Sequence, residues 1–327
     1  MTKQSELQKP IYNDEKAALA HFEKVRWPQG PVCHHCGSDN VARLAGKSTR
    51  PGLFQCREKE CRGQFTAVMG TVFEKSHIPL HKWLLATHLL CSSKKGMSAL
   101  QLHRELGFGS YRTAWFMSHR IREAMSLPTA TRGRPPMGGE GKIVEADETY
   151  FARAGEKSRI NQNTSGERRK HRDQRPKRAI VALVERGGSV RTFHVGSADK
   201  HTVTNIIIDN VAPNTKLATD ESKLYAGVTA YGFEHGTVKH SSKEYVREWV
   251  HTNSLEGYFS IFKRGMKGIY QHCAEKHLHR YLAEYDFRYN HREGLGFSDH
   301  ARTNEALKGT VGKRLTYRRT NAAGLQA

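Results

Sequence analysis

The chain has 327 residues, of which 37% are hydrophobic and 9% aromatic, enough to fill at least one sizeable core and to form two or three domains. Lys and Arg number 53 against 32 Asp and Glu, and this surplus of +21 indicates a polyanionic partner such as nucleic acid, not a small acidic metabolite. No stretch approaches the ~18 consecutive apolar residues of a membrane helix, and the polar start is unlike a signal or transit peptide, so we expect a cytoplasmic, nucleoid-associated protein with no membrane partner.

Residues 1–75 carry four of the six cysteines, as Cys33-x2-Cys36 and, 19 residues later, Cys56-x4-Cys61. In a reducing compartment such pairs indicate metal ligands before disulfides, and four thiolates match one structural Zn²⁺. The second pair has two residues more than the usual CxxC, so its turn must be wider. The alternatives are four unpaired thiols or a site that recruits His34 or His35. We therefore predict a zinc ribbon over residues 1–75.

Residues 76–128 have a helical pattern and indicate a helix-turn-helix region. A first helix follows Leu80, a second begins after Ser98, and the turn GFGS precedes a third over Tyr111–Met125. The third helix carries Arg112, His119, Arg120 and Arg122, and we expect Arg112 and Arg120 to contact DNA. Helix pairs with Gly-containing turns also occur in proteins that never touch DNA.

Residues 129–142 are rich in Gly, Pro and Arg and read as a linker. Three strands are predicted after it, over 143–151, 179–184 and 190–195, followed by a helix over 202–210 and a strand over 215–219. This order predicts an α/β domain with a mixed sheet flanked by helices, over residues 143–295, and a basic C-terminal tail over 296–327.

The segment 153–178 inserted between the first two strands holds ten Lys or Arg and three acidic residues, a surplus of +7. Such a charge density favours a DNA-gripping loop, in which Arg168, Arg169 and Lys170 would contact phosphates. The alternative is a solvated hairpin tip.

Three carboxylates fall where an α/β sheet gathers functional groups. Asp147 and Asp220 lie at or near the ends of predicted strands, and Glu256 shares one face of a helix with Lys263. There are 72 residues between Asp147 and Asp220 and 35 between Asp220 and Glu256. Phosphodiester chemistry by two Mg²⁺ or Mn²⁺ ions uses such oxygen ligands.

This layout resembles the DDE transposases, and more narrowly the zinc-ribbon-bearing, Merlin-related insertion-sequence transposases (insertion-sequence family 1595, ISXO2-like). The motifs that carry the resemblance span residues 33 to 292 in order, and they are CHHC with CREKECRGQFTAVMGTVFE, EADETYF, ATDESKLY, HTNSLEGYFSIFKRGMKG and HLHRYLAEYDFRYNHR.

The resemblance implies an RNase-H-like catalytic domain in which Asp147, Asp220 and Glu256 bind two divalent metals and Lys263 contacts DNA near the scissile phosphate. Some members of the group have Asn as the third residue, so Asn253, one turn before Glu256, is the alternative. We favour Glu256 because a carboxylate adds a full negative charge to the metal site. Asn253, at the start of the helix, could instead cap the helix backbone.

The implied function is that of a transposase, which binds the ends of a mobile DNA element and catalyses metal-dependent strand cleavage and strand transfer. Its partners would be double-stranded DNA, as element ends and target, and further copies of the chain in a synaptic complex. The alternatives are a DNA-binding regulator, a domesticated transposase without catalysis, and an RNase-H-like nuclease.

Overall fold

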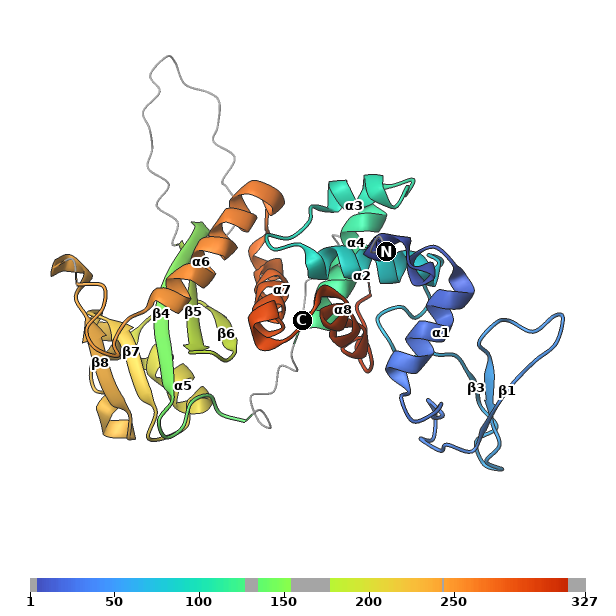
Figure 1. The fold of residues 1–327 in the computed structure, drawn as a ribbon, viewed down its shortest axis with the longest axis horizontal. Helices are drawn as coiled ribbons and strands as arrows, with labels where there is room; N and C mark the ends of the chain where they lie inside the picture. Colours follow the sequence, from blue (N-terminus) through green and yellow to red (C-terminus); the bar gives the residue numbers. More distant parts are fainter. Residues whose placement is uncertain (1–4, 127–134, 154–176, 243, 317–327) are drawn as a thin grey trace, which may run out of the picture. The chain divides into compact units, whose positions relative to one another are not determined.

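The computed structural model describes residues 5–126, 135–153, 177–242 and 244–316 (Figure 1). The chain forms two compact units. One combines the two ends of the chain, Met1–Leu127 and His291–Ala327, and the other is Pro128–Asn290. Among the described residues, no helix combines the length and the apolar character that crossing a membrane requires.

The first unit joins a small three-stranded sheet to a group of helices. Its elements are the 3₁₀ turns Glu6–Gln8, Pro10–Tyr12 and Glu293–Leu295, the helices α1 (Glu15–Arg26), α2 (Leu80–Ser92), α3 (Ala99–Glu105), α4 (Tyr111–Met125) and α8 (Asp299–Lys308), and the strands β1 (Val41–Arg43), β2 (Phe54–Cys56) and β3 (Gln64–Phe65). The three strands are antiparallel, in the order β1-β2-β3.

Side-chain caps explain where these helices begin. Asp14 accepts a hydrogen bond from the Ala17 N–H and starts α1. The N-cap residue of α2 is a proline, which has no side-chain acceptor. The Glu15 carboxylate of α1 takes its place and accepts the Leu80 N–H at 2.8 Å. Ser98 and Ser110 cap α3 and α4. The helices predicted for residues 76–128 are therefore present.

The expectation of a tail over residues 296–327 was wrong for its first part. Ser298 caps α8, which contacts α1, α2 and α4 within the same unit and buries Ala306 and Leu307. The Arg302 guanidinium donates to the Cys91 carbonyl of α2 at 3.0 Å. The structural division also falls after Asn290 and not after residue 295. The sequence signal was weak because this short helix has a low apolar content.

The second unit is the predicted α/β domain. Its elements are the strands β4 (Ile143–Arg153), β5 (Lys177–Glu185), β6 (Val190–Val195), β7 (Lys216–Asp220) and β8 (Glu234–Val238), the helices α5 (Lys200–Asn210), α6 (Asn253–Gly265) and α7 (Leu278–Asn290), the π-helix Met266–Tyr270, and the 3₁₀ turns Lys223–Tyr225, Val228–Tyr231, His240–Ser242 and Glu275–His277.

The sheet has the order β6-β5-β4-β7-β8 and is mixed, as predicted. β4, β5 and β6 pair antiparallel, whereas β4 pairs with β7, and β7 with β8, in parallel. One face of the sheet packs on α6 and α7 around Leu255, Phe262 and Leu282. The other face packs on α5 around Val203 and Ile207. The central strand β4 is therefore covered on both sides.

Candidate metal centre and acidic site

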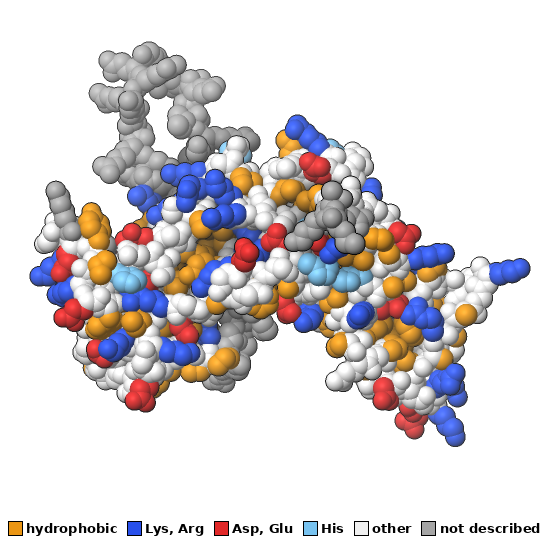
Figure 2. All heavy atoms as spheres, viewed as in Figure 1, with side chains coloured by type: hydrophobic (Ala, Val, Ile, Leu, Met, Phe, Trp, Pro, Cys, Tyr) orange, Lys and Arg blue, Asp and Glu red, His pale blue; other side chains and the backbone are white. Residues whose placement is uncertain are grey.

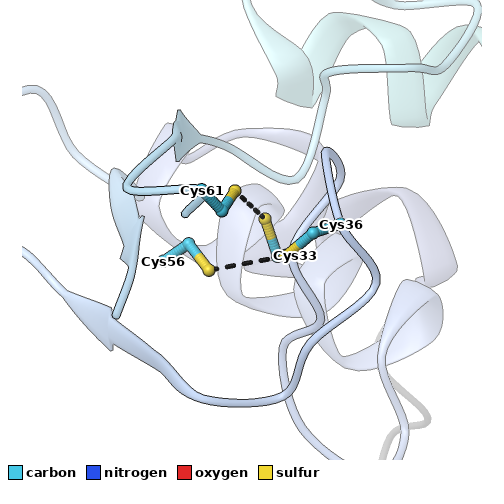
Figure 3. A group of neighbouring side chains, drawn as sticks. All are labelled: Cys33, Cys36, Cys56 and Cys61. Atoms are coloured by element: carbon cyan, nitrogen blue, oxygen red, sulfur yellow. Dashed lines mark hydrogen bonds between the residues drawn. The ribbon is translucent and has the colours of Figure 1, made fainter. Parts of the chain in front are cut away.

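The four predicted zinc ligands meet at one point in the first unit. Their sulfur atoms all lie within 4.8 Å of one another, with 3.7 Å between Cys33 and Cys61 and 3.6 Å between Cys36 and Cys56 (Figure 3). A tetrahedral ion with Zn–S bonds of about 2.3 Å holds its ligands about 3.8 Å apart. The donor set and its spacing therefore fit a structural Zn²⁺.

The surroundings of the cysteines suit a metal-held module. The local core is small, with Phe54 and Phe65 stacked and Trp27 meeting both edge-on. The longer second knuckle closes as a turn, because the Glu58 carbonyl accepts the N–H of Cys61 at 3.2 Å and that of Arg62 at 3.1 Å. The extra residues in this knuckle thus produce the wider turn that was expected.

Neither histidine of the CHHC motif joins the cluster. His34 and His35 are exposed, and His35 Nε2 lies 3.2 Å from the Gln64 carbonyl oxygen. The His35 N–H points at the Cys33 sulfur at 3.4 Å. Although burial opposes ionisation of Cys33, the backbone N–H groups of Cys36 and His35 lower the pKa of its thiol, whereas burial raises the pKa of Cys56.

The two arginines predicted to read DNA from α4 differ in their environment. Arg112 is exposed in the first turn. Arg120 is only 8% exposed, donates to the Glu74 carbonyl at 2.8 Å and lies over the Trp83 ring at 5.2 Å, and burial lowers its pKa. This environment disfavours the DNA contact expected of Arg120. Eight residues separate the two, so their directions differ by about 80° around the helix.

Arg168, Arg169 and Lys170 lie outside the described residues. On the face drawn in Figure 2, Lys and Arg side chains gather over the C-terminal half of α6, where Lys263 and Arg264 occupy the last turn. Lys263 lies over the Phe259 ring at 5.9 Å and is half-buried.

The parallel pairing of β4 and β7 brings Asp147 and Asp220 together. Glu145 pairs with Ala218, so the same register carried two residues further sets Asp147 beside Asp220. Asp220 is the last residue of β7. Asp147 lies within β4 and not at its end, because β4 continues to Arg153, but it is just beyond the part that pairs with β7.

Three other carboxylates influence the ionisation of Asp147. Burial, followed by repulsion from Asp220, Glu148 and Glu256, raises the pKa of Asp147 to about 7. Within the described residues, the four cysteines have all their ligand atoms within 4.8 Å of one another. The carboxylates do not form an equally tight set. Such a concentration of negative charge suits a hard divalent cation.

Glu148 is a member of this group that the sequence reading missed. The Tyr225 hydroxyl, which is buried, donates to Glu148 Oε2 at 2.7 Å. Burial and the nearby Asp220 raise the pKa of Glu148, whereas the Tyr225 hydrogen bond lowers it. The motif EADETYF contains Glu148, but adjacent strand residues point to opposite faces, so the pattern gave no reason to join it to Asp147.

The third predicted position lies at the start of α6. Asn253 is the first residue of the helix and is exposed, and Glu256 is exposed in the same turn. The N-cap is Thr252, whose hydroxyl lies 3.5 Å from Glu256 Oε1. The capping role expected of Asn253 is not what the structure has, because the Ser254 and Leu255 N–H groups donate to Glu145 instead.

Replacing Cys33 and Cys36 with Ser should remove the zinc. We expect about one zinc per wild-type chain and almost none in the double variant, because two thiolates are too few for the site. Elemental analysis of the purified full-length protein measures this. Cys273→Ser, which alters a thiol of the other unit, is the matched control and should keep its zinc. Equal zinc in the double variant would contradict the assignment.

Replacing Asp147 with Asn should stabilise the metal-free second unit at high pH. The pKa of Asp147 is raised from 3.8 to about 7, so the native state holds a proton that the unfolded state has lost, and the cost of ionisation grows from about pH 4 to about pH 7. The variant should therefore melt at a higher temperature than the wild type above pH 7, and the difference should shrink toward pH 4. Thermal unfolding without added divalent metal checks this, and a pH-independent difference would contradict it.

Both units of the chain match known protein families in part. Residues 138–290 match the family model of the ISXO2-like transposase domain of insertion-sequence family 1595, and residues 13–64 match the transposase zinc-ribbon domain of the same family. An uncharacterized protein in the transposable element ISH50 of Halobacterium salinarum is 28% identical over 257 residues, which cover 76% of this chain and 82% of that protein. The two models describe domains of one family, and the chain belongs to the zinc-ribbon-bearing, ISXO2-like transposases of insertion-sequence family 1595.

Proposed function

We propose that this chain binds the ends of a mobile DNA element and catalyses metal-dependent strand cleavage and strand transfer. The observation that carries the proposal is the register of β4 and β7, which sets Asp147 beside Asp220 in the middle of the sheet, with Glu148 and Glu256 near enough to help raise the pKa of Asp147. Membership of a transposase family supports the reaction class.

Asp147, Asp220 and Glu256 would hold two Mg²⁺ or Mn²⁺ ions, whose chemistry is to activate the attacking water or 3′-hydroxyl and to stabilise the leaving oxygen. Asp147 must lose its proton to bind a metal. Glu148 is held by Tyr225 and adds negative charge beside Asp220. Lys263, in the last turn of the helix that carries Glu256, would contact a phosphate near the reacting one.

DNA recognition is assigned to the other parts of the chain. The zinc ribbon, over residues 1–75, and α4 with Arg112 would recognise element ends, and the insertion with Arg168, Arg169 and Lys170 would add affinity with little sequence preference. The partners are double-stranded DNA and further copies of this chain in a synaptic complex, and the site of action would be the nucleoid. The single structural zinc would fold the ribbon.

The test is strand transfer. Full-length protein is incubated with the flanking element ends and Mg²⁺ or Mn²⁺, and joined products are scored. Cleavage without joining would indicate an RNase-H-like nuclease. Binding without cleavage would indicate a DNA-binding regulator or a domesticated transposase.

Glu256→Gln should eliminate cleavage and leave end binding intact, because the amide removes one negative charge from the metal site. Asn253→Ala is the matched control one turn earlier. It alters an exposed side chain, and we expect a stability change of about 0.5 kcal/mol or less and retained cleavage. If Asn253→Ala is inactive, folded and DNA-bound while Glu256→Gln still cleaves, the roles of the two residues are reversed.

Arg112→Ala should weaken DNA binding and lower the slope of log K against log salt by about 1, with little change in stability. Arg120→Ala should do the opposite: it leaves the Glu74 carbonyl without its donor, costs about 1–3 kcal/mol of stability and preserves the salt slope of the folded fraction. Fluorescence anisotropy at several salt concentrations and chemical unfolding measure the two effects. A reduced slope in Arg120→Ala alone would overturn the assignment.

A further inference from the structure

A buried carboxylate binds the first turn of α6. Glu145, on β4, has no exposed surface. Its Oε2 accepts the N–H of Ser254 at 2.9 Å and of Leu255 at 3.1 Å, and its Oε1 accepts the Ser254 hydroxyl at 3.0 Å. Two N–H groups that a helix start leaves without a partner are thus bound by a residue 109 positions earlier in the chain.

Arg186 completes the arrangement from the turn after β5. Its Nε donates to Glu145 Oε1 at 2.8 Å, its Nη1 to the Trp249 carbonyl at 2.7 Å and its Nη2 to the His251 carbonyl at 2.9 Å. One guanidinium therefore holds both the carboxylate and the segment that leads into α6. His251 Nδ1 lies 3.2 Å from the same Glu145 oxygen.

The cost of burying these charges is offset by their mutual contacts. An ionised carboxylate is retained inside a protein when charged and neutral donors surround it. Here Arg186 supplies the opposite charge, and the N-terminus of α6 supplies N–H groups and a favourable dipole. Because Glu145 and Arg186 both bond to the start of α6 and to the residues just before it, the network fixes the position of this helix end.

The position of this helix end matters for the acidic site. Glu145 and Asp147 are two residues apart on β4 and so project from the same face of the sheet. Leu255, which donates to Glu145, is adjacent to Glu256. Glu145 therefore links the two acidic residues: it lies two positions before Asp147 on β4, and it bonds to the helical turn that carries Glu256.

We propose that Glu145 and Arg186 are positioning residues that hold the first turn of α6 against β4, so that Glu256 is presented to the metal site formed with Asp147 and Asp220. This inference rests on the proposed function. Neither side chain touches the reacting atoms. Partners that orient metal ligands in this way commonly contribute about 10- to 100-fold in metal affinity or activity.

The test compares Glu145→Gln with Glu185→Gln in the full-length, zinc-loaded protein. Gln keeps the size of Glu145, but its NH₂ group would face donors where an oxygen now accepts. Glu185 also accepts a backbone N–H, from Gly138 at 2.8 Å, and pairs with Lys142 at 2.9 Å, away from α6, so it is a matched control. Mn²⁺ binding by calorimetry and hydrogen exchange of the amides of 254–256 are measured for each.

We expect Glu145→Gln to weaken Mn²⁺ binding about tenfold and to speed exchange at 254–256, whereas Glu185→Gln changes neither. Arg186→Lys keeps the charge but has all its donors on one nitrogen, so it cannot reach the three acceptors that three separate guanidinium nitrogens reach, and it should move both measurements in the same direction. It also serves if Glu145→Gln does not fold. Unchanged Mn²⁺ affinity in a folded variant overturns the inference, even if its melting temperature falls.

The failure of the proposed function gives a different result. The wild type and Asp147→Asn are compared for Mn²⁺ binding. If Asp147→Asn binds as much Mn²⁺ as the wild type, or if the wild type binds none, the proposed metal site is wrong. Hydrogen exchange then tests whether Glu145 and Arg186 hold the start of α6. Faster exchange confined to 254–256 in Glu145→Gln supports this role, and unchanged exchange rejects it.

Discussion

The parallel pairing of β4 with β7 is the constraint on which the acidic site depends. A parallel neighbour brings Asp220 to the level of Asp147, and covering helices on both faces remove much of the surrounding water. The carboxylates then repel one another in a medium that screens them poorly, which is why burial and neighbouring charge raise the pKa of Asp147 to about 7. The sheet therefore holds an arrangement of charge that favours a cation.

The elements of the sheet that are rich in apolar residues were predictable. β5, with six consecutive buried apolar residues, and β6 appeared at their predicted places, and Asp147 and Asp220 lie on strands as predicted, although Asp147 is not at a strand end. β8 was missed because EHGTV offers too little apolar content to predict a strand, and its place at the sheet edge comes from pairing with β7. The local residue pattern can predict that a strand forms, whereas the strands that pair with it depend on tertiary packing.

The same limit applies to single side chains. The four cysteines carried their own signal, because metal chemistry restricts both residue type and spacing. Glu145, Glu148 and Arg120 did not, because their roles depend on partners elsewhere in the chain: the start of α6, Tyr225, and the Glu74 carbonyl. From sequence alone, a charged residue in a strand or helix is predicted to be exposed to solvent. Here three such residues are wholly or partly buried.

The unit built from both ends of the chain has a consequence for biosynthesis. α1, α2 and α4 leave the ribosome early, but α8, which packs on all three, follows only after the whole of Pro128–Asn290 has been made. The second unit is continuous in the chain and can fold as soon as it emerges, whereas the N-terminal helices remain with part of their apolar surface uncovered until α8 follows. Completion of the first unit therefore comes after synthesis of the second, and a chain truncated before α8 would have a complete second unit and an incomplete first unit.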